Sequence, residues 1–180
     1  SGGTESDNTA IFGAARSKKR NGKKIITSKV EHPAVLEACK ALENEGYTVE
    51  YIGVDSQCRL DMDQLQAAVD DETILISIMT VNNETGTVMP VDQIAQLKKN
   101  ALFHTDSVQA YGKMKLKAGA ADLMSLSAHK IHGPKGSGFL YVREKTKIHP
   151  QILGGGQEGG MRSGTENVPA IAGLGEAARE

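Results

Sequence analysis

Short apolar runs alternate along the chain with stretches in which apolar positions recur every three or four residues. The short runs, which are typical of strands, lie at residues 24–27, 48–52, 73–79, 101–105, 122–127 and 138–142. The stretches with helical periodicity lie at residues 4–19, 33–45, 61–69 and 91–99, and a last helix is expected to begin near Glu166 or Val168 and to run to the end. This alternation predicts an α/β domain built on a mostly parallel sheet.

Several predicted helix starts carry residues that favour capping. Thr4 and Asp7 have capping-box spacing at the start of the first helix, and Asp61 and Gln64 have the same spacing at the start of the third. Pro33 stands in the first turn of the second helix, where its missing N–H costs nothing. These signals support the boundaries that the periodicity predicts.

Polar side chains follow three of the predicted strands. The run at 73–79 is apolar throughout, which predicts a strand that is buried on both faces, and Asn83 comes shortly after it. Asp106 and Lys130 come at or just after the ends of two later runs. Because ligands of open α/β sheets gather at the carboxyl ends of the strands, these three side chains are candidates for a single site.

The segment Ser125–Gly136 is the most informative part of the chain. It places Lys130 beside His129 and near two serine hydroxyl groups, directly before a turn that is rich in glycine and proline. An amine at the end of a buried strand can form a Schiff base with an aldehyde cofactor. On this segment alone, an exposed loop lysine explains the pattern equally well.

Two upstream features favour the cofactor. Residues 1–7 combine two glycines with Thr4 at the start of a predicted helix, and the backbone amides of a helix N-terminus bind phosphate. Asp106 and Gln109 lie just past a strand, and a carboxylate there can hold the protonated ring nitrogen of pyridoxal phosphate. A phosphate site, an acid and a lysine therefore occur in this order, each at a strand or helix end.

Composition narrows the classes of function. The chain has 180 residues, which suits one domain, and its 21 Lys and Arg against 22 Asp and Glu give a formal net charge of −1. This balance, without a basic run, argues against electrostatic nucleic-acid binding. No apolar run reaches about 18 residues, so no membrane span is predicted. The two cysteines, Cys39 and Cys58, form no CxxC pair, which favours a reducing, cytoplasmic setting, and we assign no metal ligands.

Six segments together resemble the group I cysteine desulfurases, the NifS/IscS-like family within the class V aminotransferase superfamily. In family order they are Ser1–Asn8, Glu31–Leu36, Val81–Thr87, Phe103–Lys113, Ser127–Gly136 and Gly154–Thr165. The resemblance spans nearly the whole chain. It implies the three-layer α/β/α large domain of fold-type I pyridoxal-phosphate enzymes, with pyridoxal 5'-phosphate as cofactor and L-cysteine as substrate.

The resemblance implies catalytic roles for Lys130 and His32. Lys130 matches the lysine that holds the cofactor and later moves protons at the substrate carbon, and His32 matches a histidine that stacks on the cofactor ring and serves as acid or base. Asp106 matches the partner of the pyridine nitrogen, while Gln109 and Asn83 match residues that bond the phenolic oxygen. Without the family match, a turn-capping Asp, a turn-forming Asn and a histidine beside a helix start are simpler interpretations.

Further implied contacts concern the cofactor phosphate. Gly3 and Thr4 match its cradle, although the same residues suit a plain helix cap equally well. Ser127 and His129 match phosphate contacts, with Ala128 between them in the same cofactor-binding segment.

Thr165 resembles a residue that reaches the phosphate of the neighbouring subunit. This match implies a homodimer with shared active sites. The alternative is that Thr165 caps a helix that begins at Glu166.

The chain departs from the family pattern in three ways. It starts on the phosphate loop, without the strand and N-terminal segment that precede it in the family. The stretches 96–101 and 114–121 are shorter than the family's usual spacing, which can disturb the approach to Asp106 and Ser127. The chain also ends before the family's small domain, so we expect residues 1–180 to be a fragment that holds the cofactor-binding large domain.

The missing small domain carries the family's persulfide-forming cysteine and the arginine that binds the substrate carboxylate. Cys39 falls on the apolar face of a predicted helix and is most simply a core residue, whereas Cys58 falls in a loop where it can be exposed. Neither matches a nucleophile motif, so we expect the 180 residues alone to be inactive.

The leading hypothesis is a cysteine desulfurase, which converts L-cysteine to L-alanine and passes the sulfur as a persulfide to an acceptor protein of iron–sulfur cluster assembly or thiolation. Two alternatives stay open: another class V pyridoxal-phosphate aminotransferase or lyase, and a non-catalytic fragment that holds the cofactor or only dimerises. A nicotinamide oxidoreductase is disfavoured, because no GxGxxG motif follows a strand with an acid about 20 residues later.

Overall fold

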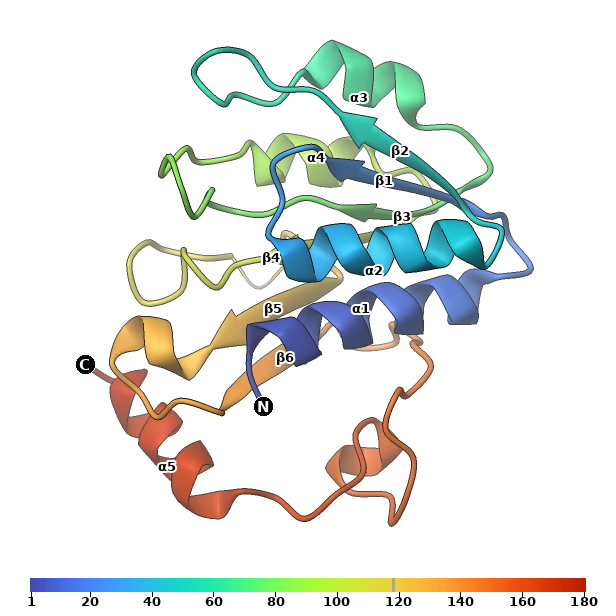
Figure 1. Ribbon diagram of the computed structural model, residues 1–180. Helices are drawn as coiled ribbons and strands as arrows, with labels where there is room; N and C mark the ends of the chain where they lie inside the picture. The colour runs from blue at the N-terminus through green and yellow to red at the C-terminus, as the bar shows by residue number, and fades with distance from the viewer. Residues whose placement is uncertain (118) are drawn as a thin grey trace.

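A six-stranded sheet lies at the centre of the computed structural model, which describes residues 1–117 and 119–180 (Figure 1). The strands are β1 Lys24–Ser28, β2 Thr48–Ile52, β3 Thr73–Ser77, β4 Leu102–Asp106, β5 Leu123–Ser127 and β6 Gly138–Val142. Their order across the sheet is β2-β1-β3-β4-β5-β6. The first five strands pair in parallel, and β6 pairs antiparallel with β5. The predicted α/β class with a mostly parallel sheet is confirmed.

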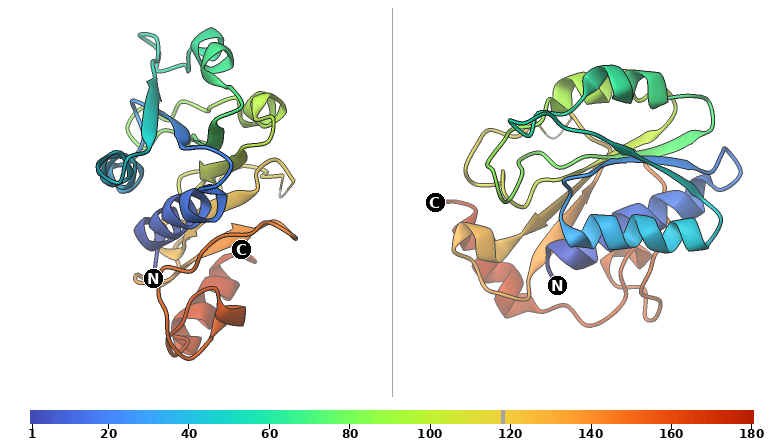
Figure 2. Two further views of the ribbon diagram at one scale, coloured as in Figure 1. Left: turned by 90° about the vertical axis from the view of Figure 1, so that its right-hand side faces the viewer. Right: turned by 45° about the horizontal axis from the view of Figure 1, so that its top comes forward.

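Helices cover both faces of the sheet, which gives three layers (Figure 2). The helices α1 (Gly3–Lys18) and α2 (Pro33–Asn44) pack on one face, and α3 (Met62–Ala68) and α4 (Val91–Leu97) pack on the other. The short 3-10 helix η1 (Ala128–Ile131) follows β5, and η2 (Glu158–Gly160) and α5 (Val168–Ala177) follow β6. Within the described residues, no helix is both long and apolar enough to cross a membrane.

Each face of the sheet has its own apolar core, because successive strand residues point to opposite faces. Ile25 of β1 packs with α1 and α2, whereas its neighbour Ile26 packs with α3 and α4. Every residue of β3, β4 and β5 is buried, which explains the uninterrupted apolar run at 73–79. Burial on both faces fixes the central strands and therefore the positions of the residues that follow them.

Two predicted capping boxes are wrong in detail. The N-cap of α1 is Gly2, whose φ of 149° suits glycine, and Thr4 lies inside the helix. Asp61 does cap α3, because its side chain accepts a hydrogen bond from the Gln64 N–H at 2.9 Å. The Gln64 side chain accepts from the backbone N–H of Gly53 at 2.7 Å instead of closing the box. The Asp61 N–H already has a partner, since it donates to the Gly53 carbonyl at 3.0 Å.

The helix α5 also begins differently from one of the predicted alternatives. Its cap is Asn167, whose side chain accepts from the Ala170 N–H at 3.3 Å, and the helix begins at Val168. Thr165 therefore does not cap this helix.

The shortened stretch at 96–101 leaves β4 paired on both sides. After α4 ends, Lys98 Nζ donates to the Ala101 carbonyl at 3.2 Å and to Asp122 Oδ2 at 2.8 Å, which closes the connection tightly. The strand β4 then pairs with β3 and with β5. The second shortened stretch, 114–121, includes residue 118, which lies outside the described residues.

Gly13 of α1 lies where the chain after β6 crosses the helix. A Cβ at Gly13 would lie 2.9 Å from the His149 carbonyl oxygen and 3.1 Å from Cβ of Ile148. Gly13→Ala should therefore lower the free energy of unfolding by about 1–3 kcal/mol, although Ala is the better helix former. Urea denaturation of the variant and the parent protein measures this change.

A matched control is Gly175 in α5, where a Cβ would meet nothing within 4 Å. Gly175→Ala should be neutral or should stabilise the protein by up to about 1 kcal/mol. Equal effects of the two substitutions would contradict the close packing at Gly13.

Candidate functional site

A pocket of about 230 Å³ lies at the carboxyl ends of the central parallel strands. Eight of the eleven residues that the sequence predicted line it: Gly3, Thr4, His32, Asn83, Asp106, Gln109, His129 and Lys130. Four further residues share the lining: Asp7, Met79, Val81 and Val108. Segments far apart in the sequence therefore meet in one pocket.

Three predicted residues do not line this pocket. Ser127 is buried behind it, where its hydroxyl lies 2.7 Å from Nδ1 of His129 and orients that ring. Ala128 is fully buried and packs against α5. Thr165 is exposed, in the described loop that precedes α5.

An ion pair links the loop that contains Thr165 to the start of α1. Arg162 Nε donates to Glu5 Oε1 at 2.8 Å, and Nη2 donates to Oε2 at 3.3 Å. The hydrogen bond from Arg162 lowers the pKa of Glu5 to about 2. This ion pair holds the loop near the helix terminus that borders the pocket.

Lys130 lies on η1, one short turn beyond the buried strand β5. The Ala128 N–H donates to the Ser137 carbonyl at 3.1 Å, and the Gly133 N–H donates to the Ala128 carbonyl at 2.9 Å. His132 ends the turn in the left-handed region, with a φ of 66°. These bonds turn the chain sharply after β5, so the exposed Lys130 side chain lines the pocket.

Asp106 is the last residue of β4 and is only 7% exposed. Its Oδ1 accepts from the Val108 N–H at 2.9 Å, so the simple turn-capping interpretation also holds. The Thr80 N–H donates to the Asp106 carbonyl at 2.8 Å, which continues the pairing of β4 with the chain after β3. Burial raises the pKa of the Asp106 carboxyl, while the hydrogen bond from the Val108 N–H opposes that rise.

The two neighbouring asparagines after β3 have different positions. Asn82 forms the turn, because its Oδ1 accepts from the backbone N–H groups of Glu84 and Thr85 at 3.0 and 2.9 Å. Asn83 lines the pocket, and its Nδ2 donates to Glu84 Oε1 at 2.7 Å. The turn-forming interpretation therefore applies to Asn82, which leaves Asn83 available to a ligand.

His32 combines a structural contact with a place in the pocket. Its Nδ1 accepts from the Ala34 N–H at 3.1 Å and so caps α2. Because Nδ1 is an acceptor, the neutral ring carries its proton on Nε2. The ring can therefore donate a hydrogen bond through Nε2 while it caps the helix.

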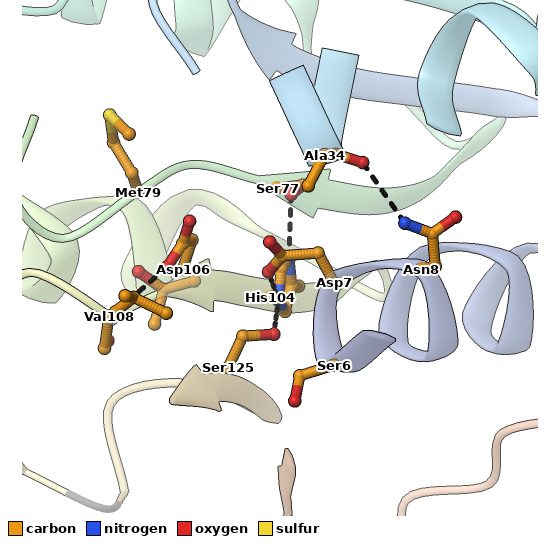
Figure 3. A network of polar contacts seen from close by, with 12 residues as sticks. Ser6, Asp7, Asn8, Ala34, Ser77, Met79, His104, Asp106, Val108 and Ser125 are labelled. Atoms are coloured by element: carbon orange, nitrogen blue, oxygen red, sulfur yellow. Dashed lines mark hydrogen bonds and ion pairs between the residues drawn. The ribbon is translucent and has the colours of Figure 1, made fainter. Parts of the chain in front are cut away.

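A buried polar network beneath the pocket was missed by the sequence analysis (Figure 3). His104 of β4 is fully buried, and its Nδ1 and Nε2 lie 2.8 and 2.9 Å from the hydroxyls of Ser77 and Ser125. Burial lowers the pKa of His104 to about 3, so the ring is neutral. Asp7 Oδ1 of α1 lies 3.6 Å from Nε2 of His104.

Three carboxyl groups gather at this point, on Asp7, Glu31 and Asp106. Burial, aided by the charge of Asp106, raises the pKa of Asp7 to about 9. Burial raises the pKa of Glu31 to about 8, although its carboxyl lies within hydrogen-bond distance of the Ser28 hydroxyl and the Met79 N–H. Asp7 and Asp106 line the pocket, so its floor holds two carboxyl groups, and an ionised Asp106 would suit a cationic ligand group.

The spacing of residues along helices and strands could have pointed to Asp7 and His104. Asp7 follows Gly3 by four residues, so both lie on one face of α1. His104 precedes Asp106 by two residues on a strand, so both point to the same face of the sheet.

Neither cysteine lies at the pocket. Cys39 is fully buried in the core under α2, as predicted, and burial raises the pKa of its thiol to about 12. The suggestion that Cys58 is exposed is wrong: it is only 9% exposed, because it packs against the core between the sheet and α3. Because thiolates are the reactive form of cysteine, Cys39 is not a candidate nucleophile. Cys58 is buried and does not line the pocket.

Comparisons with known proteins identify a family and several similar proteins. The family model described as Aminotransferase class-V matches residues 1–179. A protein of Nostoc sp. (strain PCC 7120 / SAG 25.82 / UTEX 2576) named cysteine desulfurase is 52% identical over 182 residues, which cover 98% of this chain and 45% of the relative. The chain therefore spans less than half the length of this relative.

Two solved structures have nearly the same fold. One, described as a NifS-like protein, superposes with a TM-score of 0.96 at 43% identity, over 99% of this chain and 50% of its own. The other, described as SspA in complex with cysteine, superposes with a TM-score of 0.95 at 40% identity, over 99% of this chain and 53% of its own.

His104→Gln should make stability less sensitive to acid. The folded-state pKa of His104, about 3, lies below its ordinary value of 6.5. His104 therefore contributes stability that is present above pH 6.5 and is lost as the pH falls towards 3. Between about pH 6 and pH 4, the free energy of unfolding of the variant should fall less steeply, by about 1.4 kcal/mol per pH unit.

Urea denaturation at a series of pH values measures this slope. At neutral pH, the variant should also lose about 1–3 kcal/mol, because the two serine hydroxyls lose their partner. His149→Gln, at an exposed position, is the control and should leave the slope unchanged. Equal slopes for wild type and His104→Gln would contradict a neutral buried ring.

Proposed function

Because the chain belongs to the class-V aminotransferase family, we propose that residues 1–180 form the cofactor-binding large domain of a pyridoxal-phosphate-dependent cysteine desulfurase. The reaction would convert L-cysteine to L-alanine and transfer the sulfur as a persulfide. The observation that carries this proposal is that Lys130 and Asp106 line one pocket, which joins an amine for an aldehyde to a buried acid for a ring cation. The relative from Nostoc and the structure with cysteine support the choice of substrate.

The pocket fits pyridoxal phosphate in its charge distribution. The buried Asp106 carboxyl has one hydrogen-bond donor among the described residues, the Val108 N–H, so it favours a protonated ring nitrogen as a further partner. Gly3 and Thr4 lie in the first turn of α1, where free backbone N–H groups favour a phosphate. A Cβ at Gly3 would approach Cγ2 of Val108 to 2.9 Å, so a larger residue would crowd this end of the pocket.

The described residues divide into those that hold the cofactor and those that move protons. Lys130 would bind the aldehyde carbon of the cofactor and later move a proton at the substrate α-carbon. Asp106 would keep the ring nitrogen protonated, and the bound cofactor supplies an electron sink for bond cleavage at that carbon. His32, as an acid or base beside the ring, would be the second catalytic residue.

Other residues of the pocket would orient the cofactor. Gln109 and Asn83 would bond its phenolic oxygen through their side-chain amides. His129, whose ring is oriented by the Ser127 hydroxyl, would contact the phosphate together with Thr4.

The nucleophilic thiol would come from another part of the protein. Cys39 and Cys58 are buried and do not line the pocket, and the chain covers 45% of the relative from Nostoc. The sulfur would pass from that thiol to an acceptor protein of iron–sulfur cluster assembly or thiolation. We propose a cytoplasmic homodimer, in which Thr165 reaches the phosphate of the neighbouring subunit.

The direct test is the reaction of the full-length protein with L-cysteine. We expect alanine and sulfide in equal amounts with a thiol reductant present, and Lys130→Ala should abolish both products. Borohydride reduction followed by peptide mapping should place a pyridoxyl group on Lys130 of the wild type.

Lys135→Ala is the matched control, because Lys135 is an exposed lysine in the same turn. It should keep both the labelling and the products. A label on Lys135, or transamination products instead of sulfide, would refute the assignment and favour another class V enzyme.

Asp106→Ala should weaken cofactor binding more than it weakens folding. Removal of one partner of a buried ion pair costs about 3–5 kcal/mol, which corresponds to a loss of roughly 150- to 5,000-fold in affinity. Asp106→Glu keeps the charge and should lose less. Titration of apoprotein with pyridoxal phosphate, followed by absorbance, measures both affinities, and wild-type affinity for Asp106→Ala would rule out the ring-nitrogen role.

A further inference from the structure

The carboxyl group of Asp7 has no assigned role and an unusual position. It extends from α1 into the pocket, one helical turn after Gly3, and is only 1% exposed. Its Oδ1 is buried and has no hydrogen-bond partner among the described residues. A buried oxygen without a partner is costly, and the cost is much greater when the carboxyl is ionised.

Every element that packs against Asp7 contributes groups that decide its charge. Strand β4 contributes His104 and Asp106, and the turn between β1 and α2 contributes Glu31 and His32. Strand β5 contributes the hydroxyl of Ser125, which lowers the pKa of Asp7 but by less than burial raises it. The turn η1 places His129 and Lys130 at the same pocket.

His104 does not supply a positive charge to Asp7. The 3.6 Å between Asp7 Oδ1 and His104 Nε2 would suit an ion pair only if the ring were protonated. Burial keeps the ring neutral, and both ring nitrogens already have hydroxyl partners on Ser77 and Ser125. Asp7 therefore faces two other carboxyls, and the described residues give it no buried cation as a partner.

Of the two carboxyls that line the pocket, Asp106 is better suited to ionise than Asp7. It is 7% exposed, against 1% for Asp7, and it accepts a hydrogen bond from the Val108 N–H at 2.9 Å. Two adjacent buried carboxylates repel each other, so ionisation of Asp106 favours the protonated form of Asp7.

We propose that Asp7 is a positioning residue that stays protonated, so that Asp106 is the one carboxyl of the pocket floor that ionises against a bound cation. The identity of that cation, the ring nitrogen of pyridoxal phosphate, rests on the proposed function. The protonation of Asp7 is a property of the protein itself and can be measured without the cofactor.

A protonated Asp7 has a consequence for folding. The pKa of Asp7 is raised from 3.8 to about 9, so between these values the folded protein holds a proton that the unfolded chain releases. This contribution to stability is complete below pH 3.8 and is lost as the pH rises towards 9. Because folding takes up one proton, the folding equilibrium constant falls tenfold for each unit by which the pH rises.

The test compares Asp7→Asn with wild type in the full-length apoprotein, by urea denaturation from about pH 6 to pH 8. The amide is neutral at every pH, so folding of the variant takes up one proton fewer. As the pH rises, the folding constant of wild type should therefore fall by about ten times more per pH unit than that of the variant. Asp71→Asn is the matched control, because the side chain of Asp71 is 98% exposed, and its slope should equal that of wild type. Asp7→Ser, which is also neutral, should flatten the slope in the same way if the amide prevents folding.

A second measurement is the affinity for pyridoxal phosphate. Asp7→Asn should bind it within about tenfold of wild type, because the amide preserves the neutral state, whereas Asp106→Ala should not. Equal pH slopes for wild type and both Asp7 variants would overturn the proposal, as would a loss of affinity in Asp7→Asn as large as that of Asp106→Ala. Failure of wild type to bind pyridoxal phosphate would instead refute the proposed function, whatever the slopes.

Discussion

The burial of the Asp106 carboxyl at the end of β4 is the constraint on which the rest of the pocket depends. A carboxylate that is only 7% exposed is costly unless it meets a cation or several donors, and the described residues give it one backbone donor, the Val108 N–H. Its buried neighbours Asp7 and Glu31 are also acids, and burial raises their pKa values to about 9 and about 8, so neither supplies the missing cation. The fold therefore builds a site whose electrostatic balance is completed by a cationic ligand.

The sheet makes this arrangement possible, because it fixes β4 from both sides and both faces. Strands β3 and β5 pair with β4 in parallel, so the chain after each strand emerges at the same edge. The neutral ring of His104 joins the hydroxyls of Ser77 and Ser125 across these three strands. The same order of strands brings Lys130 of η1 and the start of α1 to the pocket.

Much of the fold and site could be predicted from the sequence, for identifiable reasons. Short, uninterrupted apolar runs predicted the central strands, and the ends of those runs marked Asp106 and Lys130. Contacts between distant segments were less predictable: Gln64 binds Gly53 instead of its own helix, and Cys58 is covered by a core that local sequence does not reveal. The roles of the site residues remain predictions that come from the family resemblance.

A crystal structure of the full-length protein with pyridoxal phosphate at neutral pH tests the central claim most directly. We predict that the ring nitrogen lies about 2.7–2.9 Å from a carboxylate oxygen of Asp106, as in a charge-assisted hydrogen bond. The cofactor carbon should be joined to Nζ of Lys130, with the phosphate at the first turn of α1. A cofactor bound with its ring nitrogen away from Asp106, or bound outside this pocket, would contradict the account.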